Sequence, residues 1–159
     1  MRHGSKRSGW TFPEADMHTE RAVADDLPRI EALLRGAGLP VKGVAPLIED
    51  FLVVRSGGQV VAAGVIEPLT EGGLLRSVVV DPALRGQGLG QAVVEALVHQ
   101  SHGPLYLLTE TAPGFFASRG FVHLSRAEAP EAVRHTQEYC SLCAESAALM
   151  WRSGHANND

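Results

Sequence analysis

Apolar residues recur along this chain with two different periods, and the two periods predict helices and strands in alternation. Residues 27–34 and 89–97 carry apolar side chains three and four positions apart, which is typical of helices that face a core. The first stretch begins near Pro28 and ends before Gly36, both common helix-boundary residues. The second predicts a helix from about Gly88 to Gln100.

Short apolar runs bounded by glycine and proline predict strands. These runs lie at residues 51–55, 59–66, 74–80, 105–108, 121–124 and 147–151, and a short, weakly patterned stretch at 17–22 is expected to be the first strand. Short helices are expected at 44–48 and 113–119, and an insert at 127–145 begins a helix at Pro130. The order β-α-α-β-β-β-α-β-α-β with a terminal strand predicts an α/β protein with a mixed sheet rather than a doubly wound one.

The amino-acid composition agrees with the fold that the apolar pattern predicts. The 159 residues are 45% hydrophobic and 20% charged, as expected for a single soluble domain. A net charge of −4 gives no basic field for nucleic acid or an anionic membrane. No apolar run approaches the ~20 residues of a membrane span. We expect a flexible extension at 1–16, one domain at 17–152 and a polar tail at 153–159.

The two cysteines, Cys140 and Cys143, form a lone C-x-x-C. Zinc would need a second pair or well-spaced histidines, so we expect no metal. Two cysteines in a chain without a secretory signal predict free thiols and a cytoplasmic protein. We interpret the pair as two small buried apolar side chains, with a soft, thiophilic ligand as the alternative.

Residues 74–97 carry the chemistry. The strand ends at Asp81-Pro82, and Arg85-Gly86-Gln87-Gly88-Leu89-Gly90 then leads into the helix. Alternate glycines let the backbone turn tightly, and the amides of a helix N-terminus bind anions, which favours a phosphate. Gln91 stands where the dinucleotide fingerprint needs glycine, and the chain has no Gly-Lys-Ser/Thr, so neither nucleotide loop fits.

The R-G-x-G-x-G stretch resembles the pyrophosphate loop of the GNAT N-acetyltransferase superfamily, with Arg85, Gly88 and Gly90 on the motif positions. The resemblance implies a GNAT-like fold with the same element order. It also implies acetyl-coenzyme A as the cosubstrate, with its pantetheine arm along the preceding strand. The residues implied to hold acetyl-coenzyme A are Val78, Val79, Val80, Arg85, Gly86, Gln87, Gly88, Leu89, Gly90 and Gln91.

Three further stretches, 74–77, 105–121 and 126–143, are similar to the GNAT acetyltransferases of bacterial arsenic-resistance operons. This narrower resemblance implies an acceptor that is a small, amino-acid-like or toxic amine. We expect no nucleic-acid or membrane partner, and a homodimer is one option for the assembly. Two other functions stay open: a coenzyme A-binding regulatory module without turnover, and a protein N-acetyltransferase.

Acetyl transfer to an amine needs an amide donor for the thioester oxygen, a base for the ammonium and a route for the thiolate to leave. A bulge in the 74–80 strand would free one amide for the thioester. Glu67, after the 59–66 strand, is the first candidate for the base and Glu110 the second, with exposed turn carboxylates as the alternative. Phe116 stands where many GNAT enzymes place a proton-donating tyrosine. Because Phe116 cannot donate, the thiolate, whose conjugate thiol has a pKa of ~8.5, would leave unassisted.

Two residues are assigned to the acceptor. Arg76 is a lone cation in an apolar strand, where it either binds an anion of the substrate or pairs with a structural carboxylate. Strand alternation predicts that Arg76 shares a face with Val78 and Val80. Thr109, at the end of the 105–108 strand, is the second acceptor residue, and it lies in one of the stretches that carry the resemblance.

Overall fold

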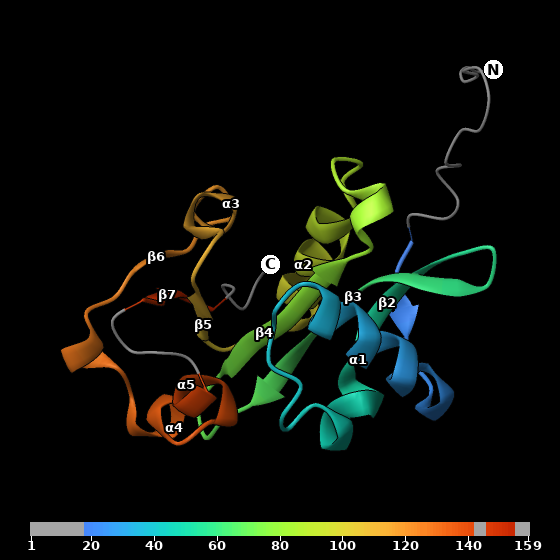
Figure 1. Ribbon diagram of the computed structural model, residues 1–159. Coiled ribbons are helices and arrows are strands. Elements are labelled where there is room, and N and C mark those ends of the chain that lie inside the picture. The colour runs from blue at the N-terminus through green and yellow to red at the C-terminus, as the bar shows by residue number, and fades with distance from the viewer. Residues whose placement is uncertain (1–17, 142–145, 155–159) are drawn as a thin grey trace.

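The computed structural model describes residues 18–141 and 146–154, and in this part of the chain helices lie on both faces of one mixed sheet (Figure 1). The strands are β1 (Glu20–Arg21), β2 (Leu52–Ser56), β3 (Gln59–Pro68), β4 (Gly73–Val80), β5 (Leu105–Thr109), β6 (Val122–His123) and β7 (Ala148–Arg152). The α-helices are α1 (Leu27–Gly36), α2 (Leu89–Gln100), α3 (Pro113–Ala117), α4 (Glu131–Arg134) and α5 (Gln137–Ser141). Short 3-10 helices lie at Ala24–Asp26, Ala45–Asp50, Pro82–Leu84 and Arg126–Glu128.

The strand order is β1-β2-β3-β4-β5-β7-β6, and within the described residues only β4 and β5 pair in parallel. The β2–β3 hairpin closes with Ser56 opposite Gln59. Because parallel neighbours need a crossover connection, α2 links β4 to β5 across one face of the sheet. The predicted mixed sheet is confirmed.

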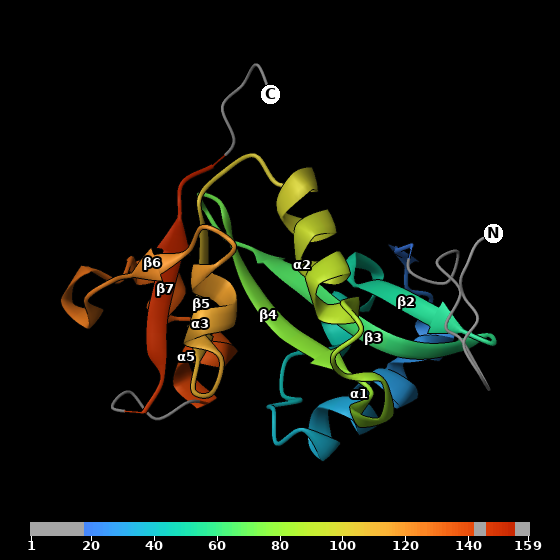
Figure 2. The same cartoon turned by 90° about the horizontal axis from the view of Figure 1, so that it is seen from above.

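The two helices predicted from apolar spacing are confirmed, and they pack on opposite faces of the sheet. The α1 helix buries Ile30, Leu33 and Leu34 in one core cluster. The α2 helix buries its own set on the other face, which it shares with the aromatic residues of the α3 region (Figure 2). That set is Leu89, Val93, Val94, Leu97 and Val98.

The insert between β6 and β7 extends the α1 face of the sheet. Val133 of α4 and Tyr139 of α5 pack with Leu74, Leu108 and Leu149, which belong to β4, β5 and β7. The predicted helix start is confirmed, since Pro130 is the N-cap of α4. Figure 1 shows α4 and α5 close to the start of β4. The insert therefore covers the region where β4 and β5 meet.

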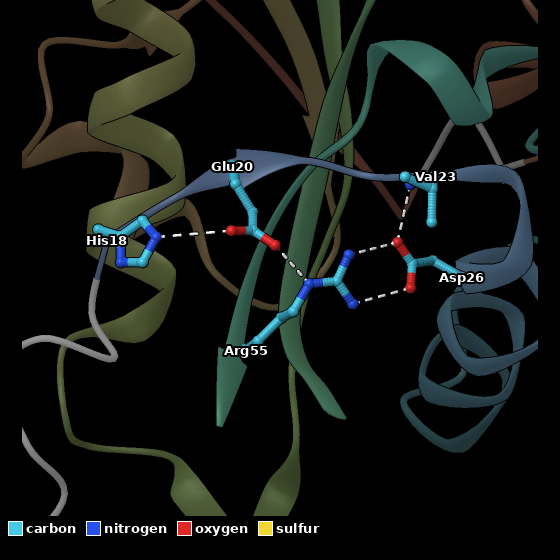
Figure 3. Close-up of polar contacts among 5 residues, drawn as sticks. All are labelled: His18, Glu20, Val23, Asp26 and Arg55. Atoms are coloured by element: carbon cyan, nitrogen blue, oxygen red, sulfur yellow. Dashed lines mark hydrogen bonds and ion pairs between the residues drawn. The ribbon is translucent and has the colours of Figure 1, made fainter. Parts of the chain in front are cut away.

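Arg55 ties the N-terminal edge of the sheet together (Figure 3). It donates two hydrogen bonds to Asp26, at 2.9 and 2.7 Å, and a third to Glu20 of β1. Asp26 also accepts from the Val23 amide at 2.8 Å. The hydrogen bonds from Arg55 hold the pKa of Asp26 below its usual value, although burial opposes the shift. This cluster joins β1, β2 and the start of α1.

Some of the sequence predictions concern residues that the structure does not describe, and one prediction, the burial of Cys140, is wrong. Residues 1–17, which include the predicted extension, lie outside the described residues, as do Cys143 and residues 155–159 of the tail. Cys140 is exposed, which corrects its expected burial. Glu138 points inward from the same helix, and a residue two positions further along a helix faces the opposite side.

Two features are absent from residues 18–141 and 146–154. In this part of the chain no helix is long and apolar enough to cross a membrane. Nor does any group of three or more histidine, cysteine, aspartate or glutamate side chains there have an arrangement that could hold a metal ion.

Candidate active site

Strand β4 contains a bulge. Val65 of β3 lies opposite Arg76, and Ala63 lies opposite Val79, so two residues of β4 face a single residue of β3, Gly64. Ser77, one of the two, has a φ of 60°, which is uncommon for a residue other than glycine. The predicted bulge is therefore present. A bulge interrupts the ladder and leaves backbone groups for another partner.

The bulge also reverses the side-chain alternation of β4, so the predicted face of Arg76 is wrong. A Cβ on Gly64 would meet side chains of α2 and would lie 3.3 Å from Val78 Cγ2, so Val78 points toward α2. Arg76 points to the other face, toward Glu67. Ser77 is the extra residue, and a shift of one residue moves the following side chains to the opposite face.

Gly88 completes the turn after β4 and is the N-cap of α2. Its φ of 86° and ψ of 9° lie in the left-handed region, where a Cβ is strained. Within the described residues no side chain caps this helix. The amides of Leu89, Gly90 and Gln91 in the first turn have no intrahelical partner. The turn thus has the backbone form of an anion site.

The surroundings of this turn fit a diphosphate. A Cβ on Gly86 would meet no described atom within 4 Å, so the backbone is open to a ligand there. Gly90 lies close to Val80 and Phe115, which wall the turn on one side. The Arg119 guanidinium lies 4.0 Å from the centroid of the Phe115 ring and adds a cation beside the wall. Donors, space and positive charge are all present.

Strands β4 and β5 separate as they approach the bulge. Among the described residues they pair over two positions, Gly73 with Leu105 and Leu74 with Tyr106. Figure 2 shows the two strands diverging beyond this point. Backbone donors and acceptors that have no strand partner are available to a ligand. The opening gives an extended molecule a path from the glycine turn along residues 78–80 to the bulge.

On the face away from α2, polar groups enclose Arg76. Its Nη1 donates to Glu67 Oε1 at 3.1 Å, and its Nη2 donates to the Lys42 carbonyl at 2.9 Å. Its Nε lies 3.3 Å from Ser77 Oγ and 3.5 Å from Glu138 Oε1. The side chain is 1% exposed. The structure therefore shows Arg76 paired with carboxylates, and its binding of a substrate anion stays a prediction.

Glu138 is the member of this cluster that the sequence did not reveal. It lies on α5 and is 5% exposed, yet its Oε1 has no hydrogen bond to any described residue. Burial raises the pKa of Glu138, the Coulombic attraction of Arg76 opposes this shift, and the nearby Glu67 adds to it. The available signal was its neighbour Tyr139, an aromatic residue that marks the packed side of the insert.

The base candidates lie in different surroundings. The Glu67 side chain is 24% exposed and bound to Arg76, so it belongs to the buried cluster rather than to an open turn. Glu110 accepts a hydrogen bond from Ser146 Oγ at 2.7 Å. The structure thus brings Glu67, Arg76 and Glu138 together, with Glu110 in a separate contact.

Thr109 and Phe116 make structural contacts near α3. The Thr109 hydroxyl accepts from the Ala112 amide at 3.0 Å and stabilises the turn into α3. Phe116 is buried, with edge-on contacts to Phe115 and Phe121 at centroid distances of 5.0 and 5.9 Å. Neither contact shows a ligand role, and the assignment of Thr109 to the acceptor stays a prediction.

Comparison with known proteins points to the same region. The family model of the acetyltransferase (GNAT) domain matches residues 48–123, which include the bulge, the glycine turn and α3. An amino-acid acetyltransferase of Mycobacterium tuberculosis is 33% identical over 119 residues, which cover 65% of this chain and 67% of that protein.

Solved structures share the fold. N-acetylglutamate synthase from Neisseria gonorrhoeae, in complex with coenzyme A and N-acetyl-glutamate, superposes with a TM-score of 0.74 at 22% identity over 87% of this chain. This chain spans only about a third of that protein, 35% of its length. Rv2747 of Mycobacterium tuberculosis, in complex with coenzyme A and NLQ, superposes with a TM-score of 0.71 at 25% identity, covering 85% of this chain and 98% of the other.

Proposed function

Because the chain belongs to the GNAT acetyltransferase family, we propose that it transfers the acetyl group of acetyl-coenzyme A to the amine of a small amino acid. The observation that carries the proposal is the place of the bulge in β4. It lies between the glycine turn at one end of the strand and the Arg76 cluster on the face away from α2. Two ligands can therefore meet at one strand, and direct transfer needs that alignment.

Acetyl-coenzyme A would supply the thioester when bound. We expect the amides of Leu89 to Gln91 to hold its diphosphate and residues 78–80 to align its arm. We expect an amide at the bulge to donate to the thioester oxygen as negative charge develops there. Glu67 remains the proposed base, and Arg76 the proposed partner of an acidic group on the acceptor.

The acceptor class rests on the relatives. The Mycobacterium tuberculosis relative is named an amino-acid acetyltransferase, and Arg76 lies one residue from the bulge. The narrower assignment to arsenic-operon enzymes stays a prediction, because none of the three relatives has a name that links it to arsenic. We also propose that the protein is cytoplasmic, as its thiol content suggested.

One observation favours a second candidate, a coenzyme A-binding module without turnover. Phe116 is an apolar, buried residue at the position where many members of the family place a tyrosine. A coenzyme A-release assay separates the two functions, because the module would bind coenzyme A and release none from the acetylated form.

The test of the cosubstrate site is Gly88→Val. A branched side chain at φ 86° lies where the diphosphate must approach the backbone. We expect the Kd for coenzyme A, measured by calorimetry, to rise by about tenfold or more. Gly57→Val is the matched control, because Gly57 has a φ of 60° and no neighbour of its Cβ position within 4 Å in the β2–β3 turn. Equal Kd values for the two variants would contradict the assignment.

The test of the reaction is a coenzyme A-release assay over a panel of acceptors. The panel contains amino acids, their α-carboxamides, organoarsenical and phosphinic amino acids, simple amines and peptides with a free N-terminus. We expect amino acids to be acetylated fastest. Acetylation of peptides alone would make the protein a protein N-acetyltransferase, and no release with any acceptor would favour the binding module.

A further inference from the structure

We propose that Glu138 occupies, in the free protein, the place on Arg76 that the acceptor's carboxylate takes in the complex, so that Glu138 sets the preference among acceptors. The inference rests on the proposed function and names a specificity-determining residue for it.

Access to Arg76 is closed in the free protein. The Arg76 side chain is 1% exposed, so no ligand can reach its guanidinium unless a covering group moves. Two segments cover it, the loop at Lys42 and Gly43 and the helix α5. They also touch each other, because a Cβ on Gly43 would lie 3.2 Å from Gln137 Cγ and 3.4 Å from Arg76 Nη1.

Among the three charged or carbonyl partners of Arg76, Glu138 is held most weakly. Glu67, which lies opposite Leu74 of β4, accepts a hydrogen bond from Arg76 at 3.1 Å, and the Lys42 carbonyl accepts one at 2.9 Å. Glu138 approaches to 3.5 Å without forming a hydrogen bond to a described residue. Its helix, α5, is five residues long. Glu138 is therefore the partner that an incoming carboxylate displaces at the lowest cost.

The charge of the cluster explains why the exchange suits an amino acid. Arg76 faces two carboxylates, and a buried group of one cation and two anions carries an excess negative charge that is costly away from water. This excess agrees with the raised pKa of Glu138. An amino acid replaces the Glu138 carboxylate with its own and adds an ammonium beside Glu67. The exchange leaves equal numbers of positive and negative charges.

The position of Arg76 places such an acceptor correctly for transfer. Arg76 directly precedes the bulge, and its Nε lies 3.3 Å from the hydroxyl of Ser77, a residue of the bulge. When the carboxylate of an amino acid binds Arg76, the amine of the same amino acid lies next to the bulge. The glycine turn lies on the side of α2, so the two ligands do not compete for the same space.

The experiment compares Glu138→Gln with Glu131→Gln. Glu131 lies on α4 of the same insert, and its side chain is 82% exposed. The acceptors are the amino acid that gives the highest rate in the panel and its α-carboxamide, which keeps the amine and lacks the carboxylate. We expect Glu138→Gln to lower the ratio of KM for the amino acid to KM for the carboxamide by about tenfold. Glu131→Gln should leave this ratio unchanged.

A second measurement uses the wild-type protein and needs no mutation. Calorimetry and hydrogen exchange are recorded with coenzyme A present, first with the best monocarboxylic amino acid of the panel and then with its α-carboxamide. We expect the amides of 137–141 to exchange several-fold faster with this amino acid bound, because Glu138 leaves the cluster, and to stay unchanged with the carboxamide.

Three outcomes would overturn the inference. An unchanged KM ratio in Glu138→Gln would show that the carboxylate does not compete with Glu138. An equal loss of kcat with both acceptors would make Glu138 the base instead. Slower exchange of 137–141 with the amino acid bound would show that α5 closes over the ligand instead of moving away from Arg76. The proposed function fails on a different result, the absence of coenzyme A release by the wild-type protein.

Discussion

Arg55 and Arg76 lie on the same sheet and each meets two carboxylates, but the two clusters differ in how well those carboxylates are satisfied. Arg55 donates two hydrogen bonds to Asp26, which also accepts from a backbone amide (Figure 3). Arg76 donates one to Glu67, while Glu138 Oε1 has none from any described residue. The pKa of Asp26 is lowered by the bonds from Arg55, and the pKa of Glu138 is raised by burial.

The difference indicates different roles. A carboxylate with full hydrogen bonding stabilises the fold, and the Arg55 cluster does so by joining β1 and α1 to the sheet. A buried carboxylate with an unsatisfied oxygen costs stability, and such a group calls for an explanation. The Arg76 cluster lies beside the bulge where transfer is proposed. We infer that its incomplete bonding is retained for the ligand that completes it.

The largest expected effect comes from removing each arginine in turn. Arg76→Leu leaves Glu67 and Glu138 without a cation between them, in a site where the side chain of Glu138 is 6% exposed. We expect a loss of about 3–5 kcal/mol in the free energy of unfolding at pH 7, measured in urea. Arg55→Leu should cost less, about 1–2 kcal/mol, because the Arg55 side chain is 25% exposed and water can reach the cluster. Equal losses would show that the burial of the cluster does not determine the cost of removing its arginine.

The next effect is on Asp26. Its pKa is lowered in the folded state, so its ionised form contributes stability above its ordinary pKa of 3.8, and this is lost as the pH falls through the folded value. Asp26→Asn should therefore cost about 2 kcal/mol at pH 7 and progressively less below pH 3.8. Urea unfolding at several pH values measures this. Asp25→Asn, at an exposed neighbouring position, is the control, and a loss that does not depend on pH would contradict the cause.

Much of the fold could be predicted from local patterns. The helices α1 and α2 and the β2–β3 hairpin follow from apolar spacing, because that spacing records which side chains face a core. The glycine turn was predictable for a different reason, since only glycine tolerates the conformation that Gly88 adopts. The end strands β1 and β6 are shorter than predicted, two residues each, because each pairs with one neighbour alone.

The Arg76 cluster could not be predicted in the same way. A bulge was expected from the chemistry of transfer, but its place at Ser77 has no glycine to mark it, so strand alternation put Arg76 on the wrong face. The partner Glu138 comes from an insert whose position over β4 depends on tertiary packing. Periodicity reports burial along one element, and it carries no information about which distant charge arrives beside a buried one.

The smallest effect is also the sharpest test of the comparison. The pKa of Glu138 is raised above its ordinary 4.5 in the folded state, so the folded protein holds this proton more tightly than the unfolded chain. The stability that this group contributes to the wild type is full below pH 4.5, falls as the pH rises toward the folded pKa, and stays reduced above that pKa.

Glu138→Gln, which resembles the protonated form, should match the stability of the wild type near pH 4 and exceed it at pH 7 by on the order of 1 kcal/mol. Urea unfolding of the variant and the wild type at each pH cancels the other titrations, and Glu131→Gln is again the control. Two carboxylate-to-amide changes, one at the N-cap of α1 and one on α5, should thus act in opposite directions at neutral pH, with Asp26→Asn destabilising and Glu138→Gln stabilising. If Glu138→Gln is instead less stable than the wild type at pH 7, the Arg76 cluster is a structural ion pair like that of Arg55. Glu138 is then not held in place of a ligand.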